Sequence, residues 1–424
     1  LLCGILTAVD LNEKAALEHR DLYVNALEAE NKVKNQLFLL MSDETAGYFT
    51  TLSKKSEELK AAIQKKDWKN VNKSFAEVNL LQARRVSALY KTRNYDLYYH
   101  DYITQEDTLQ TLRKERGLPE FTDSEIAADW ANEFMMGDET QMFPYYQFTA
   151  RFYDQLEKQH IDTLTYSTTD SSTLIVQFIR SLFPILPVIL ITLLCFDMIH
   201  EDKDSGVLKT LLSQPRKRIH YLHQKMRSNM AALTAIFLVP LLLLSLCFAM
   251  FDHYDRVQAP VLANVHGLTS LEQMENTLTE TEVNNAMTYT LGITRYFSIP
   301  YHVQSPNTKF DLMPMWQFTG YVIVMALLVI AFCMLLNLLF NVICQNKMVS
   351  LVLTLAILLL GMGIAQPQNM EAWFAWLPFT YFNPVEILSG YSSYTYLHGI
   401  LTLTLSCSLL YVITRWIFQR KDAA

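Results

Sequence analysis

The sequence lacks the short motifs that mark the common catalytic classes. It has no G-x-x-x-x-G-K-S/T phosphate loop, no H-E-x-x-H zinc motif and no G-x-S-x-G nucleophile motif. Because a phosphate loop supplies the backbone amides that hold nucleotide phosphates, this chain cannot itself be such an ATPase. The other two absences leave no signature of a zinc protease or an α/β-hydrolase, and we predict no catalytic residue.

Cysteine is missing from the two long polar regions of the chain, residues 10–172 and 253–315. All six cysteines lie within or beside apolar blocks, so neither a disulfide framework nor a paired-cysteine metal site is expected. The spacing of His200, His220 and His223 is typical of solvated loop histidines and predicts no metal site. The net charge of −7 gives no indication of a nucleic-acid partner.

Long apolar runs, in contrast, are abundant. A transmembrane helix needs about 20 predominantly apolar residues. Runs such as VIVMALLVIAFCMLL are apolar on every face, whereas buried helices of soluble proteins carry polar breaks at helical spacing. Five segments are predicted to span the membrane: 174–199, 231–251, 316–344, 348–366 and 396–418.

Residues 1–9 are also apolar, with no initiator methionine and no basic flank. We interpret them as the end of a truncated first transmembrane helix, with a cleaved signal peptide as the alternative. The predicted fold class is therefore an all-α membrane protein with six transmembrane helices.

Basic residues in the loops predict the orientation of these helices. The loop at 200–230 carries seven Lys and Arg residues and is predicted to be cytoplasmic, whereas the longer loop at 252–315 carries three and should lie outside. Alternation then places residues 10–173 outside and both the tail at 419–424 and the N-terminus of the full-length protein inside. A small membrane protein without disulfides suits a bacterial plasma membrane.

Residues 10–120 are predicted to form long helices, as a hairpin or small bundle standing on the membrane. Apolar residues recur there at three- and four-residue spacing, and no proline precedes Pro119. The aromatic segment 143–153 favours an interfacial belt or local packing. A surface that contacts a transported substrate is the alternative.

The most informative stretch is the loop at 200–230, which predicts a short amphipathic helix at the cytoplasmic face. Acidic residues and Ser205 can cap a helix start, an apolar stripe follows, and Pro215 stops the helix. Such a helix either only anchors the loop or docks into a groove on a partner ATPase. The residues that carry this pattern are Glu201, Asp202, Asp204, Gly206, Leu208, Leu211, Leu212, Pro215 and Arg218.

This pattern, followed by Lys225, resembles the loop of type-2 ATP-binding-cassette (ABC) exporter permeases. Members of that family usually carry Glu-x-Glu-x-Gly-Thr, where this chain has Asp-Lys-Asp-Ser-Gly-Val at 202–207. A second resemblance lies at 367–395, where the family has a Leu-Pro…Asn-Pro…Gly stretch that forms a re-entrant hairpin before the last helix. The corresponding residues here are Pro378, Asn383, Pro384 and Gly390.

The resemblance implies a permease subunit of an ATP-driven exporter, with a large external domain between the first two helices. It implies two permease subunits, identical or different, above two cytoplasmic ABC ATPase subunits that bind the ATP and magnesium. No cofactor is expected on this chain itself, and its other neighbour is membrane lipid. The apolar spans and aromatic segment favour an amphipathic or lipophilic substrate: a peptide, a drug or a lipid.

Three polar residues within the predicted spans are candidates for a translocation path. Arg180 either reaches the headgroups or faces such a path, since charge inside a membrane is usually functional. Asn337 and Asn341 share one helix face, which favours interhelical hydrogen bonds over substrate contact.

Two other function classes are compatible with the sequence. A secondary carrier driven by an ion gradient would need carboxylates at the membrane midplane, whereas Asp197 lies at the inner edge. A sensor or scaffold would bind a ligand with its external helices and signal through the loop. Stimulation of ATP hydrolysis by a transported substrate would distinguish a pump from a sensor.

Overall fold

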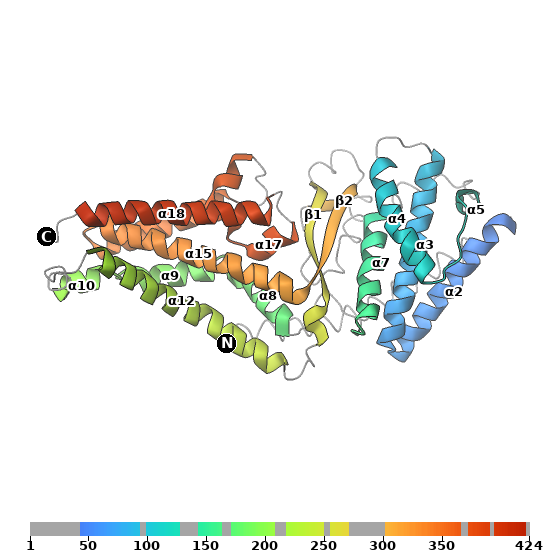
Figure 1. Cartoon of the computed structure of the whole chain (residues 1–424), viewed down its shortest axis with the longest axis horizontal. Coiled ribbons are helices and arrows are strands. Elements are labelled where there is room, and N and C mark those ends of the chain that lie inside the picture. The colour runs from blue at the N-terminus through green and yellow to red at the C-terminus, as the bar shows by residue number, and fades with distance from the viewer. Residues whose placement is uncertain are drawn as a thin grey trace. The chain divides into compact units, whose positions relative to one another are not determined.

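A computed structural model describes residues 43–93, 99–127, 143–162, 171–207, 218–249, 255–270, 302–365, 372–390 and 394–420. The chain forms two compact units (Figure 1). The membrane unit comprises Leu1–Thr7, Asp170–His253 and Trp316–Ala424. The polar unit comprises Ala8–Thr169 and Tyr254–Met315, so the two long polar regions of the sequence fold together.

Four helices of the membrane unit are long and apolar enough to cross a bilayer. They are α12 (Arg218–Ala249), α15 (Met315–Ile343), α16 (Lys347–Ile364) and α18 (Tyr396–Arg420). The last three begin and end within two residues of the predicted spans. The first apolar segment, at 1–9, lies outside the described residues.

The predicted span at 174–199 is wrong as a continuous helix. The structure divides it into α8 (Ser171–Leu182) and α9 (Leu186–Cys195), with a bend of 73° between them. Pro184 lies in the break and Pro187 in the first turn of α9. Proline has no N–H and its ring clashes with the preceding turn, which explains why the helix ends here. Counted as one broken span, the pair is a fifth membrane crossing among the described residues.

The predicted boundary between the loop with its docking helix at 200–230 and the next helix at 231 is also corrected. Helix α12 begins at Arg218, so its first turns carry the basic residues Lys225 and Arg227. Polarity marks where the apolar part of a helix ends, but it does not end the helix itself. No Pro or Gly occurs in α12 before Pro240, so nothing in its charged first turns breaks the helix. Pro240 itself lies within the apolar part, and α12 continues past it.

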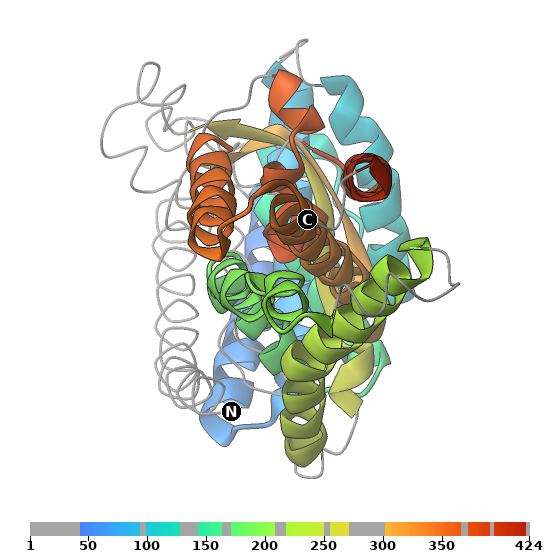
Figure 2. The ribbon, with the colours of Figure 1, turned by 90° about the vertical axis from the view of Figure 1, so that its left-hand side faces the viewer.

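Helix α15 lies at the centre of the membrane unit (Figure 2, orange). Most of its apolar side chains are buried, including Met325, Val329 and Leu338. The outer helices instead expose many, such as Leu246 of α12 and Leu360 of α16. Exposed apolar surface on this scale is costly in water but favourable in lipid or against another membrane helix.

The polar unit contains five described helices: α2 (Asp43–Lys65), α3 (Trp68–Arg93), α4 (Tyr99–Glu115), α5 (Asp123–Ala127) and α7 (Phe143–Lys158). The predicted helical bundle is thus confirmed from Asp43 onwards. Its core includes Tyr48, Leu52, Leu80 and Leu81, all fully buried.

Aromatic residues of α7 belong to this core. Phe148, Phe152 and Tyr153 are each at most 1% exposed. Local packing, one of the two preferred roles for segment 143–153, is therefore confirmed for these three residues. A substrate-contacting surface is wrong for them, because their rings are covered by the unit itself.

The sequence did not predict the two antiparallel strands of the polar unit, β1 (Pro260–Ser270) and β2 (His302–Pro314). They follow the short 3₁₀ helix Asp255–Gln258. Strand β2 packs on α7, with the rings of Phe148 and Phe310 edge to face at 5.2 Å. The region predicted as a loop at 252–315 therefore completes the fold of the region at 10–173.

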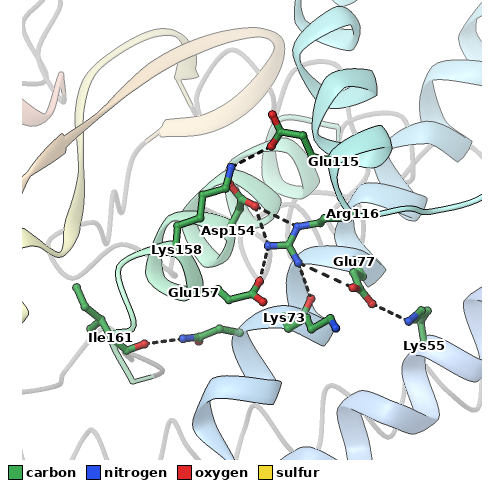
Figure 3. A network of polar contacts seen from close by, with 10 residues as sticks. Lys55, Lys73, Glu77, Glu115, Arg116, Asp154, Glu157, Lys158 and Ile161 are labelled. Carbon is green, nitrogen blue, oxygen red and sulfur yellow. Dashed lines mark hydrogen bonds and ion pairs between the residues drawn. The ribbon is translucent and has the colours of Figure 1, made fainter.

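A buried ion network joins the helices of the polar unit (Figure 3). The Arg116 guanidinium donates to Asp154 at 2.7 Å and to Glu157 at 2.5 Å, both on α7. It also lies 3.9 Å from Glu77 of α3. The side chains of Arg116 and Asp154 are only 9% and 6% exposed. Burial lowers the pKa of Arg116, but the hydrogen bonds to Asp154 and Glu157 outweigh burial and raise it.

The first prediction concerns Arg116. Replacing it with Met removes the guanidinium from Asp154 and Glu157 and leaves Lys158 as the cation at Asp154 and Lys55 as the cation at Glu77. We expect a loss of about 3 kcal/mol in the stability of the polar unit, the low end for breaking a buried ion pair, because these lysines remain. Faster amide hydrogen exchange in α3 and α7 of the full chain, held in lipid nanodiscs, measures this loss.

Lys114→Met is the matched control, because Lys114 and its partner Glu120 are both 60% exposed. Such an exposed ion pair contributes at most about 1 kcal/mol. Unchanged exchange in Arg116→Met, or an equal effect of both variants, would contradict the role given to the network.

Candidate functional site

The polar loop predicted to contact an ATPase begins as the short helix α10 (His200–Asp204). Ser205 caps its end, and Gly206 follows with φ +74°, a left-handed conformation that glycine adopts without strain. Asp202 and Asp204, which the sequence predicts to cap the start of the amphipathic helix that follows, lie within α10. Because residues 208–217 lie outside the described residues, their capping role stays a prediction.

Val207 follows Gly206, and its side chain is exposed. The apolar stripe predicted to follow it falls in 208–217, outside the described residues. The structure therefore does not test the roles predicted for Leu208, Leu211, Leu212 and Pro215, which remain predictions.

Asp202 is the residue of this loop that contacts α12. Its Oδ2 lies 2.7 Å from the Lys225 Nζ and accepts a hydrogen bond from the Tyr221 hydroxyl at 2.5 Å. Tyr221 and Lys225 are four residues apart and so share one helix face. One carboxylate oxygen thus ties α10 to the first turns of α12, while Glu201 and Asp204 are exposed.

Electrostatics stabilise this contact in its charged form. Burial raises the pKa of Asp202, but the hydrogen bonds from Lys225 and Tyr221 outweigh burial and hold the pKa below its ordinary value of 3.8. A depressed carboxyl pKa contributes stability above the ordinary value, and this contribution is lost as the pH falls through the lowered one. The contact is therefore fully charged at neutral pH.

The same end of α12 contacts α18. The rings of Tyr221 and Phe418 stack with their centroids 6.0 Å apart. Close by along α12, the His223 Nε2 and the Tyr411 hydroxyl share a hydrogen bond of 2.5 Å. A continuous chain of contacts therefore runs from α10 through α12 to α18.

The segment at 367–395 forms a second candidate site, built from short helices. They are the 3₁₀ helices η3 (Ala372–Trp376) and η4 (Pro378–Tyr381) and the helix α17 (Pro384–Ser389). Pro378 and Pro384 each begin a helix, and Gly390 ends α17 with φ +92°. The predicted helix breaks are confirmed, while re-entry of the segment into the membrane stays a prediction.

Side-chain hydroxyls complete the hydrogen bonding of this broken backbone. The Thr380 Oγ1 donates to the Phe374 carbonyl at 2.8 Å, and the Tyr381 hydroxyl donates to the Ala375 carbonyl at 2.9 Å. Thr402 of α18 donates to the same Ala375 oxygen at 3.3 Å. These side chains replace the donors that a continuous helix would supply.

Two glycines let η4 approach the long helices closely. A Cβ on Gly361 of α16 would lie 2.6 Å from the Phe379 ring. A Cβ on Gly399 of α18 would lie 2.6 Å from the Tyr381 ring. Since neither position leaves room for a methyl group, the hairpin packs against the backbone of both helices.

The predicted polar residues of the spans lie in two places. Arg180 lies on α8 beside the hairpin, where the Asn383 Nδ2 is 3.5 Å from its carbonyl oxygen. Asn341 donates across helices to the Cys195 carbonyl of α9 at 3.1 Å, which confirms interhelical bonding for this residue. Asn337 is fully buried, and its side-chain atoms have no hydrogen-bond partner among the described residues.

A further ion pair lies at the same end of α9 as the Asn341 contact. Lys347, just after the α15–α16 turn, lies 3.4 Å from Asp197. Within the described ranges, no group of His, Cys, Asp and Glu side chains is arranged to hold a metal ion.

Comparison with known proteins decides the family. The family model for ABC-2 family transporter proteins matches residues 11–416, almost the whole chain. The chain belongs to the ABC-2 transporter family. Among curated proteins and among solved structures there is no significant match. Membership makes this ABC-2 protein a multi-pass membrane permease subunit of an ABC transporter.

Sequence reasoning missed several residues of the two sites in this ABC-2 permease. Tyr221, Tyr411 and Phe418 belong to the first of them, yet none was singled out. The four-residue spacing of Tyr221 and Lys225 was a usable signal for a shared face on α12. The pairing with α18 depends on contacts between segments about 190 residues apart, for which a single sequence carries no signal.

The second prediction tests Asp202. Asp202→Asn removes the charge that pairs with Lys225, and we expect hydrogen exchange of residues 200–207 at pH 7 to rise on the order of tenfold. The ratio of variant to native exchange should shrink below pH 3.8, because the native carboxyl then becomes protonated. Glu201→Gln makes the same change at an exposed position and should have little effect. An equal effect of both variants would refute the contact.

The third prediction compares two glycines of α16. Gly361→Ala places a methyl group against the Phe379 ring, and overpacking of this kind costs about 1–3 kcal/mol. The thermal unfolding midpoint of the purified permease should fall accordingly.

Gly363→Ala is the control, because a Cβ at that position would have no neighbouring atom within 4 Å. It should be neutral or stabilising, since Ala favours helix over Gly by about 1 kcal/mol. Equal midpoints for both variants would show that the hairpin does not pack as described.

Proposed function

We propose that this ABC-2 permease subunit exports an amphipathic or lipophilic substrate across a plasma membrane, driven by a separate ABC ATPase. The loop at 200–217 is the docking site of that ATPase on the cytoplasmic side. The observation that carries this proposal is the Asp202 contact. Through Lys225 and Tyr221 it connects the loop to α12, and through Phe418 the connection continues to α18.

A docking loop must be stiffly joined to the spans if its movement is to rearrange them. Charged hydrogen bonds and buried aromatic stacking supply this stiffness. Val207 is exposed at the position where the sequence predicts that the apolar docking stripe begins. Closure of the ATPase subunits would then move α10, α12 and α18 together.

The folding of both long polar regions into one unit supports the proposed orientation. Residues of 8–169 and of 254–315 share this unit, as expected of regions on one side of the membrane. The loop at 200–230 carries seven Lys and Arg residues and the loop at 252–315 only three. This contrast favours the outside of the cell for the polar unit, with both termini of the full-length protein inside. Two such permease subunits, identical or different, pair through the exposed apolar faces of their outer helices, and the rest of that surface contacts lipid.

The fourth prediction is that an ATPase with a phosphate loop copurifies with the permease from native membranes. The double variant Leu208→Asp, Leu211→Asp should lose this partner, because two charges would then lie on the apolar docking stripe. Lys209→Asp places the same charge off the stripe and should retain the ATPase. If no ATPase copurifies with the native permease, the sensor and carrier alternatives replace the exporter.

A further inference from the structure

The prolines at the bend between α8 and α9 remove helical donors from backbone carbonyls, among them the carbonyl of Arg180. In a continuous helix the carbonyl of residue 180 accepts from the N–H of residue 184. Pro184 has no N–H, so the Arg180 carbonyl loses this donor. At membrane depth an unpaired carbonyl costs several kcal/mol, and the protein itself must supply a replacement.

The hairpin supplies it. The Asn383 Nδ2, at the start of α17, is 3.5 Å from the Arg180 carbonyl oxygen, a long hydrogen bond. The amide oxygen of Asn383 is buried and has no hydrogen-bond partner among the described residues. The side-chain amide of Asn383 is thus directed at the carbonyl that Pro184 deprives of its helical donor.

The hairpin also carries a carboxylate, Glu386. Glu386 lies three residues after Asn383 on the same short helix α17, and α17 packs on α8, the helix that carries Arg180. A carboxylate on this helix is therefore placed to pair with the Arg180 guanidinium. Elsewhere the hairpin rests on Gly361 and Gly399, so it joins α8, α16 and α18 at one end of the membrane unit.

We propose that Asn383 and Glu386 form a latch on Arg180 that holds the hairpin against the bend at 183–185. Release of this latch opens the hairpin end of the membrane unit during transport. Asn383 and Glu386 are positioning residues and need not touch the substrate. The latch stands on contacts within this chain alone, while its role in transport rests on the proposed function.

A mutant cycle in the permease alone, in lipid nanodiscs, tests the latch. Asn383→Ala should raise hydrogen exchange of residues 372–390 severalfold in the native background. In the Pro184→Ala background it should have little effect, because the substituted residue has an N–H that can donate to the Arg180 carbonyl. In the Pro187→Ala background the full effect should remain. Alanine at position 187 restores an N–H, but the helical acceptor of that N–H is the carbonyl of residue 183 and not the carbonyl of Arg180. Equal effects of Asn383→Ala in all three backgrounds would overturn the latch.

A charge exchange provides a second test that does not depend on the folding of the proline variants. Glu386→Gln and Arg180→Met should each raise exchange in the hairpin, and the double variant should raise it no further. Arg180→Glu combined with Glu386→Arg should restore protection. Additive single effects, or no recovery on exchange of the charges, would overturn the electrostatic part. Because no ATPase is present, failure here leaves the proposed export function intact, and failure of copurification leaves the latch intact.

Discussion

Inside a bilayer every backbone N–H and C=O must find its partner within the protein, because hydrocarbon offers none. The membrane unit meets this constraint with long helices and, at Pro184 and in the hairpin, with side chains. Thr380, Tyr381 and Thr402 serve the carbonyls of the short helix η3, and Asn383 serves the carbonyl that Pro184 frees. Side-chain donors thus complete the hydrogen bonding of the irregular parts of the unit. Two of these bonds also join separate elements, because Thr402 of α18 donates to η3 and Asn383 donates to α8.

The two candidate sites of this ABC-2 permease follow from this construction and lie at opposite ends of the membrane unit (Figure 1). At one end, Asp202 joins the loop after α9 to α12, and aromatic stacking continues to α18. At the other end, the hairpin joins α8, α16 and α18. Helix α18 takes part in both, so a movement of the loop has a direct route to the hairpin. In an exporter, such a route would relate ATP-driven movement on one side to opening on the other.

The sequence predicted most of the long helices because the apolar segment and the helix have nearly the same bounds in α15, α16 and α18. It misplaced the start of α12, since the charged residues around Lys225 continue the helix beyond its apolar part. Pro184 and Pro187 were visible within the span at 174–199, yet apolar length alone did not reveal the bend that they cause. Strands β1 and β2 were missed, because their pairing joins segments separated by about 30 residues. The loop and hairpin motifs could be located from their resemblance, but the partners of Asp202 and Asn383 are tertiary contacts.

The most direct measurement of the central claim is site-specific photocrosslinking in native membranes. A photoreactive amino acid is placed at Val207, an exposed residue at the start of the predicted docking stripe, and separately at Trp376, an exposed residue of the hairpin at the other end of the unit. The account predicts a crosslink to a protein with a phosphate loop from position 207 and none from position 376. An ATPase crosslink from 376, or none from 207 in a permease that still copurifies with its ATPase, would contradict the assignment of the loop as the docking site.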